Sequence, residues 1–475
     1  MNFGISTRQT WTRYSCAIVC AVATWVSSSP ASAQSGEPAR LSLAQALELA
    51  DGSNPALRRA SNATLINGTE MRSTWADQLL PRAQLTLFNT AFTGNLQRRA
   101  LDNFGNPIAN PAAEWNFFSQ TSHSLGLTWR VQGASLFQAY RRQQLTNQDR
   151  DVALLRARTD VAIGVRRRYN DALEQKALLD AEEELLSARR IDLDVAQRLF
   201  SLALRNRVDI LNAELAVEQQ ALSVQQQESR YRRTLLALRT AMGLSDDQPF
   251  EVGDDDLPLF DPSGFDEGAL VARALAVNPS LLQSDVQLRS AELALSEQKT
   301  AWWPEVRVGL DVYRQAYEAE TSALFDTSIG TDLESRFFLG FSIPALNGVF
   351  RQNAQQQQAA IDLRNQRELG REVRLQLSEA IRGALLELQT QWASARLSER
   401  AREIAGEALE LAREEYRLGT RSFEELRSAF EQEAGTRRQV ITARHSFVDA
   451  LLTLEEAVGA SVREEEVAGT LGPGG

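Results

Sequence analysis

Apolar residues recur at heptad spacing in two long stretches of the chain, 135–200 and 350–416. In the first stretch, six successive heptad positions are apolar, namely Val165, Ala172, Leu179, Leu186, Leu193 and Phe200. This spacing keeps one apolar seam on one face of a helix. Proline is absent between Pro111 and Pro249. The pattern therefore predicts an uninterrupted helix that is roughly 100 Å long, at about 1.5 Å of rise per residue.

Four shorter segments alternate apolar and polar residues with a period of two, which is typical of strands with one apolar face. Their apolar positions are Ala83, Leu85 and Leu87; Leu125, Leu127, Trp129 and Val131; Val306, Val308, Leu310 and Val312; and Phe337, Leu339, Phe341 and Ile343. Each predicted strand is about ten residues long, the length of a tilted strand that crosses a membrane. A polar loop is expected over 93–121, between the first two strands.

The same order of patterns occurs twice along the chain, which predicts two internal structural repeats. Asn278-Pro279 repeats Asn54-Pro55, a pair that suits a helix start because asparagine caps the helix and proline tolerates the first turn. The segments around the two breaks in the helical pattern, 200–213 and 416–429, align without a gap. We therefore expect a first repeat at 34–244 (helix, two strands, long helix, helix), an acidic Pro/Gly linker at 245–267, a second repeat at 268–460 and a flexible C-terminal tail at 461–475.

The first 33 residues have the pattern of a signal peptide. Arg8 and Arg13 precede an apolar run over 16–26, and Ala31-Ser32-Ala33 offers the small residues of a cleavage site. Both cysteines lie within this segment, so the processed chain is expected to have no disulfide or thiolate chemistry. Acidic residues outnumber basic ones, 62 to 51, and no basic block stands out, which disfavours a nucleic-acid partner.

After residue 33, no apolar run reaches the ~20 residues that a membrane-spanning helix requires. An exported protein of this kind is soluble, or it crosses a membrane as strands. Aromatic residues gather at the ends of the predicted strands, as the interfacial girdle of a membrane barrel requires: Trp129, Trp302, Trp303, Phe337 and Phe338. This favours membrane strands over the alternative, a soluble antiparallel sheet with one buried face.

Four strands cannot close a barrel, and an open sheet edge is not tolerated in lipid. Closure must then come from further copies of the chain through cyclic symmetry. Two copies give eight strands, whose lumen side chains can fill, whereas three copies give twelve strands and leave an open lumen. The predicted helices over 55–80 and 208–242 together match the length of the single long helix, so stacked short helices can lie beside one continuous helix in a uniform tube.

The helix-strand-strand-helix plan, the two Asn-Pro helix starts and the turn Tyr416-Arg417-Leu418-Gly419-Thr420-Arg421-Ser422 resemble the TolC-like outer-membrane efflux protein family, the outer membrane factors. The resemblance covers essentially the whole chain after the signal segment. It implies an α+β membrane protein, a homotrimer in which a long α-helical coiled-coil barrel joins a transmembrane β-barrel with four strands from each protomer.

The family resemblance also implies function. It describes a passive exit duct in the outer membrane and periplasm, belonging to a tripartite efflux pump or a type I secretion system. The implied partners are further copies of the chain, a periplasmic adaptor (membrane fusion) protein, an inner-membrane pump and outer-membrane lipid. The substrate is not indicated, because in such systems the pump selects it.

By the same resemblance, the two helix breaks are periplasmic tips where the adaptor docks: Leu202, Ala203, Leu204, Arg205, Leu418, Gly419, Thr420 and Ser422. A periplasmic gate is implied at Asp209, Tyr416, Arg421 and Glu425, with Tyr416 facing Asp209 and Arg421 close by. In a trimer Glu425 forms an acidic ring that favours cations. The alternative is that these gate residues are ordinary solvated helix-surface residues.

The chain lacks the patterns of an enzyme. After the signal segment it has two histidines far apart in sequence, His123 and His445, and no spaced ligand cluster or glycine-rich phosphate loop. The acidic run Glu182-Glu183-Glu184 is interpreted as a solvated helix face. No catalytic residue, cofactor or metal site is predicted. The competing interpretation is a periplasmic coiled-coil scaffold or adaptor with a soluble β-domain, which does not explain why strand pairs with aromatic ends recur.

Overall fold

The structure is a computed structural model that describes residues 39–98, 104–109, 112–132, 134–202, 206–245, 249–253, 259–318, 333–343 and 346–462. The chain divides into a unit Met1–Ala39 and a unit Arg40–Gly475, and the helices and the large sheet belong to the second. The predicted signal peptide, 1–33, lies outside the described residues.

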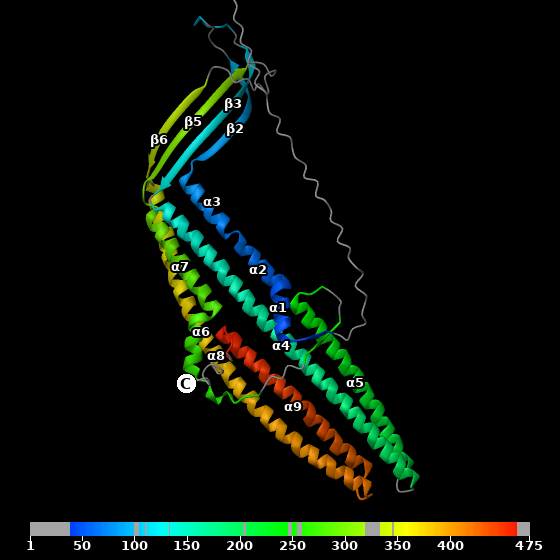
Figure 1. Ribbon diagram of the computed structural model, residues 1–475. Coiled ribbons are helices and arrows are strands. Elements are labelled where there is room, and N and C mark those ends of the chain that lie inside the picture. The colour runs from blue at the N-terminus through cyan, green and yellow to red at the C-terminus, as the bar shows by residue number, and fades with distance from the viewer. Residues whose placement is uncertain are drawn as a thin grey trace, which may run out of the picture. The chain divides into compact units, whose positions relative to one another are not determined.

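Two long helices confirm the prediction from the heptads. Helix α4 (Ser135–Ser201) has 67 residues and α8 (Leu346–Arg417) has 72. Each is followed by a shorter helix that packs against it, α5 (Arg207–Met242) after α4 and α9 (Phe423–Val458) after α8 (Figure 1). The heptad seam of α4 is buried at Val165 and Ala172, which are 1% and 0% exposed, whereas Phe200 at its end is 40% exposed.

Five shorter helices precede the strand pairs, and they are α1 (Leu43–Ser53), α2 (Pro55–Leu65), α3 (Asn67–Leu79), α6 (Glu267–Val277) and α7 (Pro279–Thr300). The single helix expected over 55–80 is divided at Ile66 into α2 and α3. Asn67 and Gly68 follow this break, and both are weak helix formers. In the second half the corresponding helix, α7, is continuous.

Four antiparallel strands form one sheet in the order β2-β3-β5-β6. Their bounds are β2 (Arg82–Arg98), β3 (Ala113–Gln132), β5 (Glu305–Glu318) and β6 (Glu334–Ser342). Strands β2 and β3 have 17 and 20 residues, so the loop expected over 93–121 is wrong for most of its length.

The reason for this error is a β-bulge in β2. Between Thr86 and Asn89 the register shifts, which gives β2 one residue more than β3 and reverses the alternation of its faces. Beyond the bulge the pairing continues to Arg98 with Ala113. The alternation of apolar and polar residues is therefore interrupted at the bulge, although the strand itself continues.

The long helices lie in one layer. Helix α4 packs against α5 on one side and α9 on the other, and α9 packs against α8 (Figure 1). Nearer the sheet, α2 and α3 pack against α4, while α7 lies between α4 and α8. Helix α8 is therefore one edge of the layer along its length, and α5 followed by α2 and α3 is the other.

The Asn-Pro helix starts join short helices end to end with α5 and α9. The Asn54 side chain accepts from the Ala56 amide at 2.8 Å and also donates to the Ala241 carbonyl at the end of α5, at 2.7 Å. Helix α5 ends at Gly243, which has a φ of 77°. Asn278 donates in the same way to Ala457 O at the end of α9, at 2.9 Å. The expected stacking of short helices beside a long one is thus made by two equivalent junctions.

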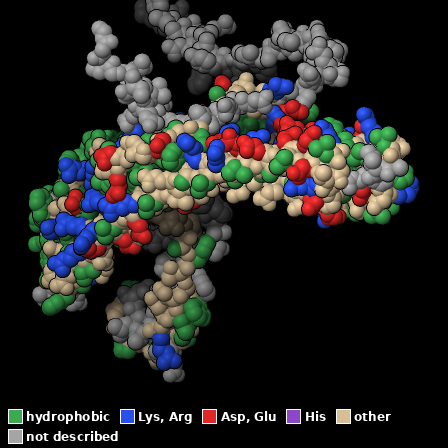
Figure 2. Space-filling model, turned by 90° about the horizontal axis from the view of Figure 1, so that it is seen from below, with side chains coloured by type: hydrophobic (Ala, Val, Ile, Leu, Met, Phe, Trp, Pro, Cys, Tyr) green, Lys and Arg blue, Asp and Glu red, His purple; other side chains and the backbone are tan. Residues whose placement is uncertain are grey.

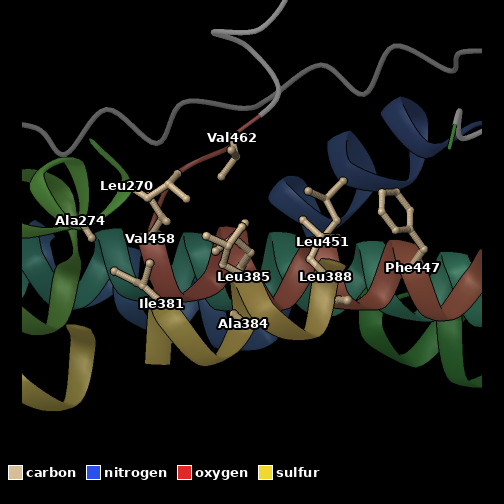
Figure 3. Packing of buried hydrophobic residues seen from close by; sticks show 12 residues of the cluster. Leu270, Ala274, Ile381, Ala384, Leu385, Leu388, Phe447, Leu451, Val458 and Val462 are labelled. Atoms are coloured by element: carbon tan, nitrogen blue, oxygen red, sulfur yellow. The ribbon is translucent and has the colours of Figure 1, made fainter. Parts of the chain in front are cut away.

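The connection between the two repeats packs against the helices where the structure describes it. Strand β4 (Phe250–Val252) pairs with β1 (Ala39–Leu41), and the short 3₁₀ helix η1 (Pro262–Gly264) contacts α8. Figure 3 shows a buried apolar cluster from α6, α8 and α9 in which Ile381 is 0% exposed. Val462 belongs to this cluster at 4% exposure, so the expected tail 461–475 begins with packed residues, and 463–475 lie outside the described residues.

Candidate functional site

The four-stranded sheet has one apolar face. Paired residues in an antiparallel sheet share a face, and neighbours along a strand alternate between faces. The register pairs Leu127 with Leu310 and Leu310 with Phe337, which carries one apolar row across β3, β5 and β6. On this face of β6, Phe337 and Leu339 are 70% and 69% exposed. An exposed apolar surface of this extent requires a second apolar phase or partner.

The opposite face of the sheet carries charged side chains that pair with one another. Arg336 lies 3.2 Å from Asp311 across β6 and β5. Glu305 contacts Arg307 at 2.8 Å and Arg130 of the adjacent strand at 3.3 Å. A sheet with one apolar and one charged face fits a wall between lipid and water.

The predicted interfacial aromatics divide between these surfaces. Trp129 and Phe337 lie on the apolar face, and Trp303, just before β5, is 54% exposed. Trp302 is half-buried. Phe338 lies on the charged face instead, because it follows Phe337 directly in a strand. Its ring covers Gly309 so closely that an added Cβ there would overlap the ring.

The second helix tip is a tight, capped turn. Gly419 adopts a φ of 80°, which only glycine adopts without strain. Ser422 and Glu425 form a capping box at the start of α9, in which the Glu425 carboxylate accepts from the Ser422 amide at 2.9 Å. At the first tip Leu202 is 67% exposed, while Ala203, Leu204 and Arg205 lie outside the described residues.

The four predicted gate residues lie near these tips in different environments. Tyr416 is 1% exposed, and its ring packs edge-on against Phe423 with centroids 6.0 Å apart. Arg421 contacts Glu415 at 2.9 Å. Asp209 is in the first turn of α5, where its amide donates to the Asn206 side chain at 3.0 Å.

Glu425 is already bound within its own helix. Hydrogen bonds from the amide and hydroxyl of Ser422 hold the pKa of the Glu425 carboxyl below its ordinary value. The carboxylate is exposed and ionised at neutral pH, and it stabilises the start of α9 in addition to the ring role expected of it.

Sequence reasoning missed a polar seam between α4 and α9. Glu182, interpreted as part of a solvated face, is only 6% exposed and accepts hydrogen bonds from Arg438 of α9 and Gln220 of α5. Arg437 contacts the neighbouring Glu184 at 2.6 Å. Glu182 lies three residues after Leu179, a spacing that places it beside the heptad seam, so the signal was present in the sequence.

Charge on the outside of the helices is mixed. Figure 2 shows acidic and basic side chains intermingled over the face that it presents. A groove of about 570 Å³ lies between α4, α8 and α9, and glutamates dominate its charged lining: Glu184, Glu399, Glu403, Glu407, Glu410 and Glu433. Three arginines also line it, so this surface has no single sign of charge.

The described part of the chain holds neither of two other kinds of site. No helix there is long and apolar enough to cross a membrane. No group of three or more histidine, cysteine, aspartate or glutamate side chains there is arranged to hold a metal ion.

Comparison with known proteins gives a family match and several similar folds. Residues 270–460 match the family model described as "Outer membrane efflux protein". The chain is similar to the solved structure of CusC, with 17% identity, a TM-score of 0.69 and coverage of 88% of this chain and 92% of that chain. It is also similar to the CmeC outer membrane channel of Campylobacter jejuni, with 14% identity, a TM-score of 0.68 and coverage of 90% and 88%. No curated protein matches the sequence at a significant level.

A third similar structure is the open state of the MtrE outer membrane channel of Neisseria gonorrhoeae, with 15% identity, a TM-score of 0.66 and coverage of 88% of this chain and 89% of that chain. The fold likeness extends over both halves of the chain, and the family match covers most of the second half. Residues 270–460 therefore match the outer membrane efflux protein family, and the chain as a whole has the fold of the outer membrane channels that it resembles.

Proposed function

We propose that three copies of this chain form a passive exit duct, with a twelve-stranded barrel in the outer membrane and a helical tunnel in the periplasm. In this proposal an inner-membrane pump delivers the substrate, and a periplasmic adaptor joins the pump to the duct. The observation that carries the proposal is the sheet with one apolar and one charged face, whose two outer strands have no partner within the described chain.

The strand order supports closure by several copies. The edge strands β2 and β6 are different segments, and an open edge is not tolerated in lipid. Pairing β6 of one protomer with β2 of the next is a heterologous contact, which closes into a ring. Three copies supply twelve strands, enough to keep a water-filled lumen lined by the charged face.

The helical layer has matching edges. Both edge helices expose apolar stripes, with side chains 50–72% exposed: Val208, Leu211, Leu215 and Leu222 on α5, and Leu397, Ile404 and Leu411 on α8, with Leu418 just after its end. The stripes follow heptad spacing, which suits packing of one helix against another. A ring that joins α5 of one protomer to α8 of the next buries both stripes at the same contacts that close the barrel.

In this proposal the helix tips form the periplasmic end of the duct, where the adaptor and the pump bind. They lie at the end of the helices away from the sheet (Figure 1). We assign adaptor docking to the tip residues and gating to Asp209, Tyr416, Arg421 and Glu425, on the strength of the family resemblance and of their positions within a few residues of the two tips. A tripartite efflux pump and a type I secretion system both remain within this proposal.

Electron microscopy of the purified, detergent-solubilised protein tests the assembly. We expect hollow cylinders with threefold end views, recovered from the outer-membrane fraction. Leu411→Glu places a charge in the α8 stripe and should reduce the trimer fraction, whereas Leu411→Met keeps an apolar side chain and should not. Monomers or solid rods from the unaltered chain would refute the duct.

A further inference from the structure

We propose that three arginines on the charged face of the sheet, Arg82, Arg130 and Arg307, make the periplasmic end of the barrel prefer anionic over cationic solutes, opposite in sign to the Glu425 ring assigned to the helix tips. They lie where the strands join α3, α4 and α7, at the periplasmic end of the barrel. The inference rests on the proposed function, because it requires this face to line a closed barrel. It goes further by assigning the lumen a preferred sign of charge.

Two of the arginines face each other directly. Arg130 of β3 and Arg307 of β5 are partners in the register, so both guanidinium groups lie on the same face of adjacent strands. Like charges in this position repel one another unless a carboxylate lies between them. Glu305 supplies that carboxylate, 3.3 Å from Arg130 and 2.8 Å from Arg307. One carboxylate shared by two guanidinium groups leaves one positive charge.

The third arginine adds to this excess. Arg82 pairs with Thr128, which is two residues from Arg130 and therefore on the same face, and its side chain is exposed. Three arginines against one glutamate give each chain two net positive charges at this level. Further along the strands, Arg336 and Asp311 pair, and Glu334, the register partner of Tyr313 on the same face, adds a negative charge. The positive charge is therefore concentrated at one end of the face.

The excess is unusual in this chain, whose net charge is −11. Three copies place six positive charges around one ring of the lumen, where low-dielectric walls focus the field. Rings of arginine or lysine favour anions in pores. Arg130 and Arg307 keep 53% and 46% of their side-chain surface exposed, so solutes can approach them. Guanidinium groups do not lose their protons in proteins, so the preference should hold across the working pH range.

The test is the reversal potential of the reconstituted protein in a planar bilayer under a potassium chloride gradient. The background is the Glu425→Gln variant, because an acidic ring at the tips favours cations. In this background we expect chloride permeability to exceed potassium permeability by about threefold or more. Arg130→Gln combined with Arg307→Gln should bring the ratio of chloride to potassium permeability to one or below. Arg130→Lys combined with Arg307→Lys keeps both charges and should leave this ratio unchanged. Glu305→Gln should raise the ratio. Arg98→Gln is the control, since the register places Arg98 on the opposite face of β2.

The outcomes separate the two proposals. In the Glu425→Gln background, conductance with a cation preference, or an anion preference that Arg130→Gln combined with Arg307→Gln leaves unchanged, overturns the arginine ring but keeps the duct. The absence of any conductance from the reconstituted protein overturns the duct and the ring together. If Glu305→Gln raises the ratio of chloride to potassium permeability and Arg130→Gln combined with Arg307→Gln lowers it, these side chains determine which sign of ion the barrel prefers.

Discussion

The junction between α5 and α2 depends on a glycine, and its replacement by alanine should be among the costliest single-atom changes in the chain. Gly243 ends α5 with a φ of 77°. A Cβ added there would lie 2.8 Å from Asn54 Cα, 2.8 Å from Ser53 O and 2.9 Å from Pro55 Cδ. All of these atoms belong to the backbone or to a proline ring, so none can move aside as a flexible side chain could.

The expected cost has two parts. Alanine in the left-handed region costs about 1 kcal/mol relative to glycine. Crowding a packed site costs a further ~1–3 kcal/mol, because the start of α2 must move by several tenths of an ångström. That movement also strains the hydrogen bonds to the end of α5, from Asn54 Nδ2 to Ala241 O and from Ser53 Oγ to Met242 O. We therefore expect Gly243→Ala to destabilise the fold by about 2–4 kcal/mol.

The assay is guanidinium denaturation of the purified protein followed by helical circular dichroism. Gly419→Ala is the matched control, since Gly419 has a φ of 80° but nothing within 4 Å of the added Cβ. It should cost only the ~1 kcal/mol of the left-handed backbone. Gly459→Ala, with contacts at 3.0 and 3.1 Å across the second junction, should resemble Gly243→Ala.

A second control tests whether replacing a glycine by alanine can also stabilise the protein. Gly164 lies inside α4 with nothing within 4 Å of an added Cβ, so Gly164→Ala should stabilise the helix by about 0.5–1 kcal/mol. The reasoning about the junctions would be refuted if Gly243→Ala and Gly419→Ala shifted the denaturation midpoint equally. Such a result would mean that the close approach of α2 to α5 contributes nothing.

Two further predictions concern the seam between α4 and α9. Glu182→Ala removes a buried carboxylate and leaves Arg438 without its acceptor. Because the arginine is partly exposed, the loss of stability should be about 2–3 kcal/mol in the same assay. The control is Glu183→Ala on the exposed face, which should change stability by less than about 0.5 kcal/mol. Burial, helped by the charge of Arg444, lowers the pKa of His445 to about 4 from its ordinary 6.5, so the unfolded chain binds a proton there before the folded chain does. The free energy of unfolding should therefore fall as the pH drops from about 6.5 to 4, by up to ~3 kcal/mol more than in the His445→Gln variant. Equal pH profiles of stability for the two proteins would contradict the lowered pKa of His445.

Much of the helical architecture could be predicted from the chain's pattern. The heptads with Val165 and Ala172 predicted an unbroken helix, and α4 spans them because no proline interrupts the stretch and glycine is nearly absent from it. The Asn-Pro pairs predicted helix starts at the correct residues, α2 and α7. These are local properties, in which propensity, capping and periodicity act within a few turns of the same segment.

Other features depended on segments far apart in sequence. The bulge near Thr86 shows itself only in the pairing of β2 with β3, so the pattern alone ended the strand too early. Glu182 is polar in sequence, yet it is buried because Arg438, 256 residues away, meets it there. Alternation alone places Phe338 on the charged face, but its ring covers Gly309 only because the register of β5 and β6 pairs the two residues.

The sequence by itself determined where the long helices run, where they begin and which strand residues are apolar, since each follows from a periodicity that one segment carries alone. The tertiary structure decided which strands are neighbours, which arginines share a face and why both junction glycines are required. Those properties come from contacts between distant segments, and a periodicity says which side of an element is buried but not what buries it.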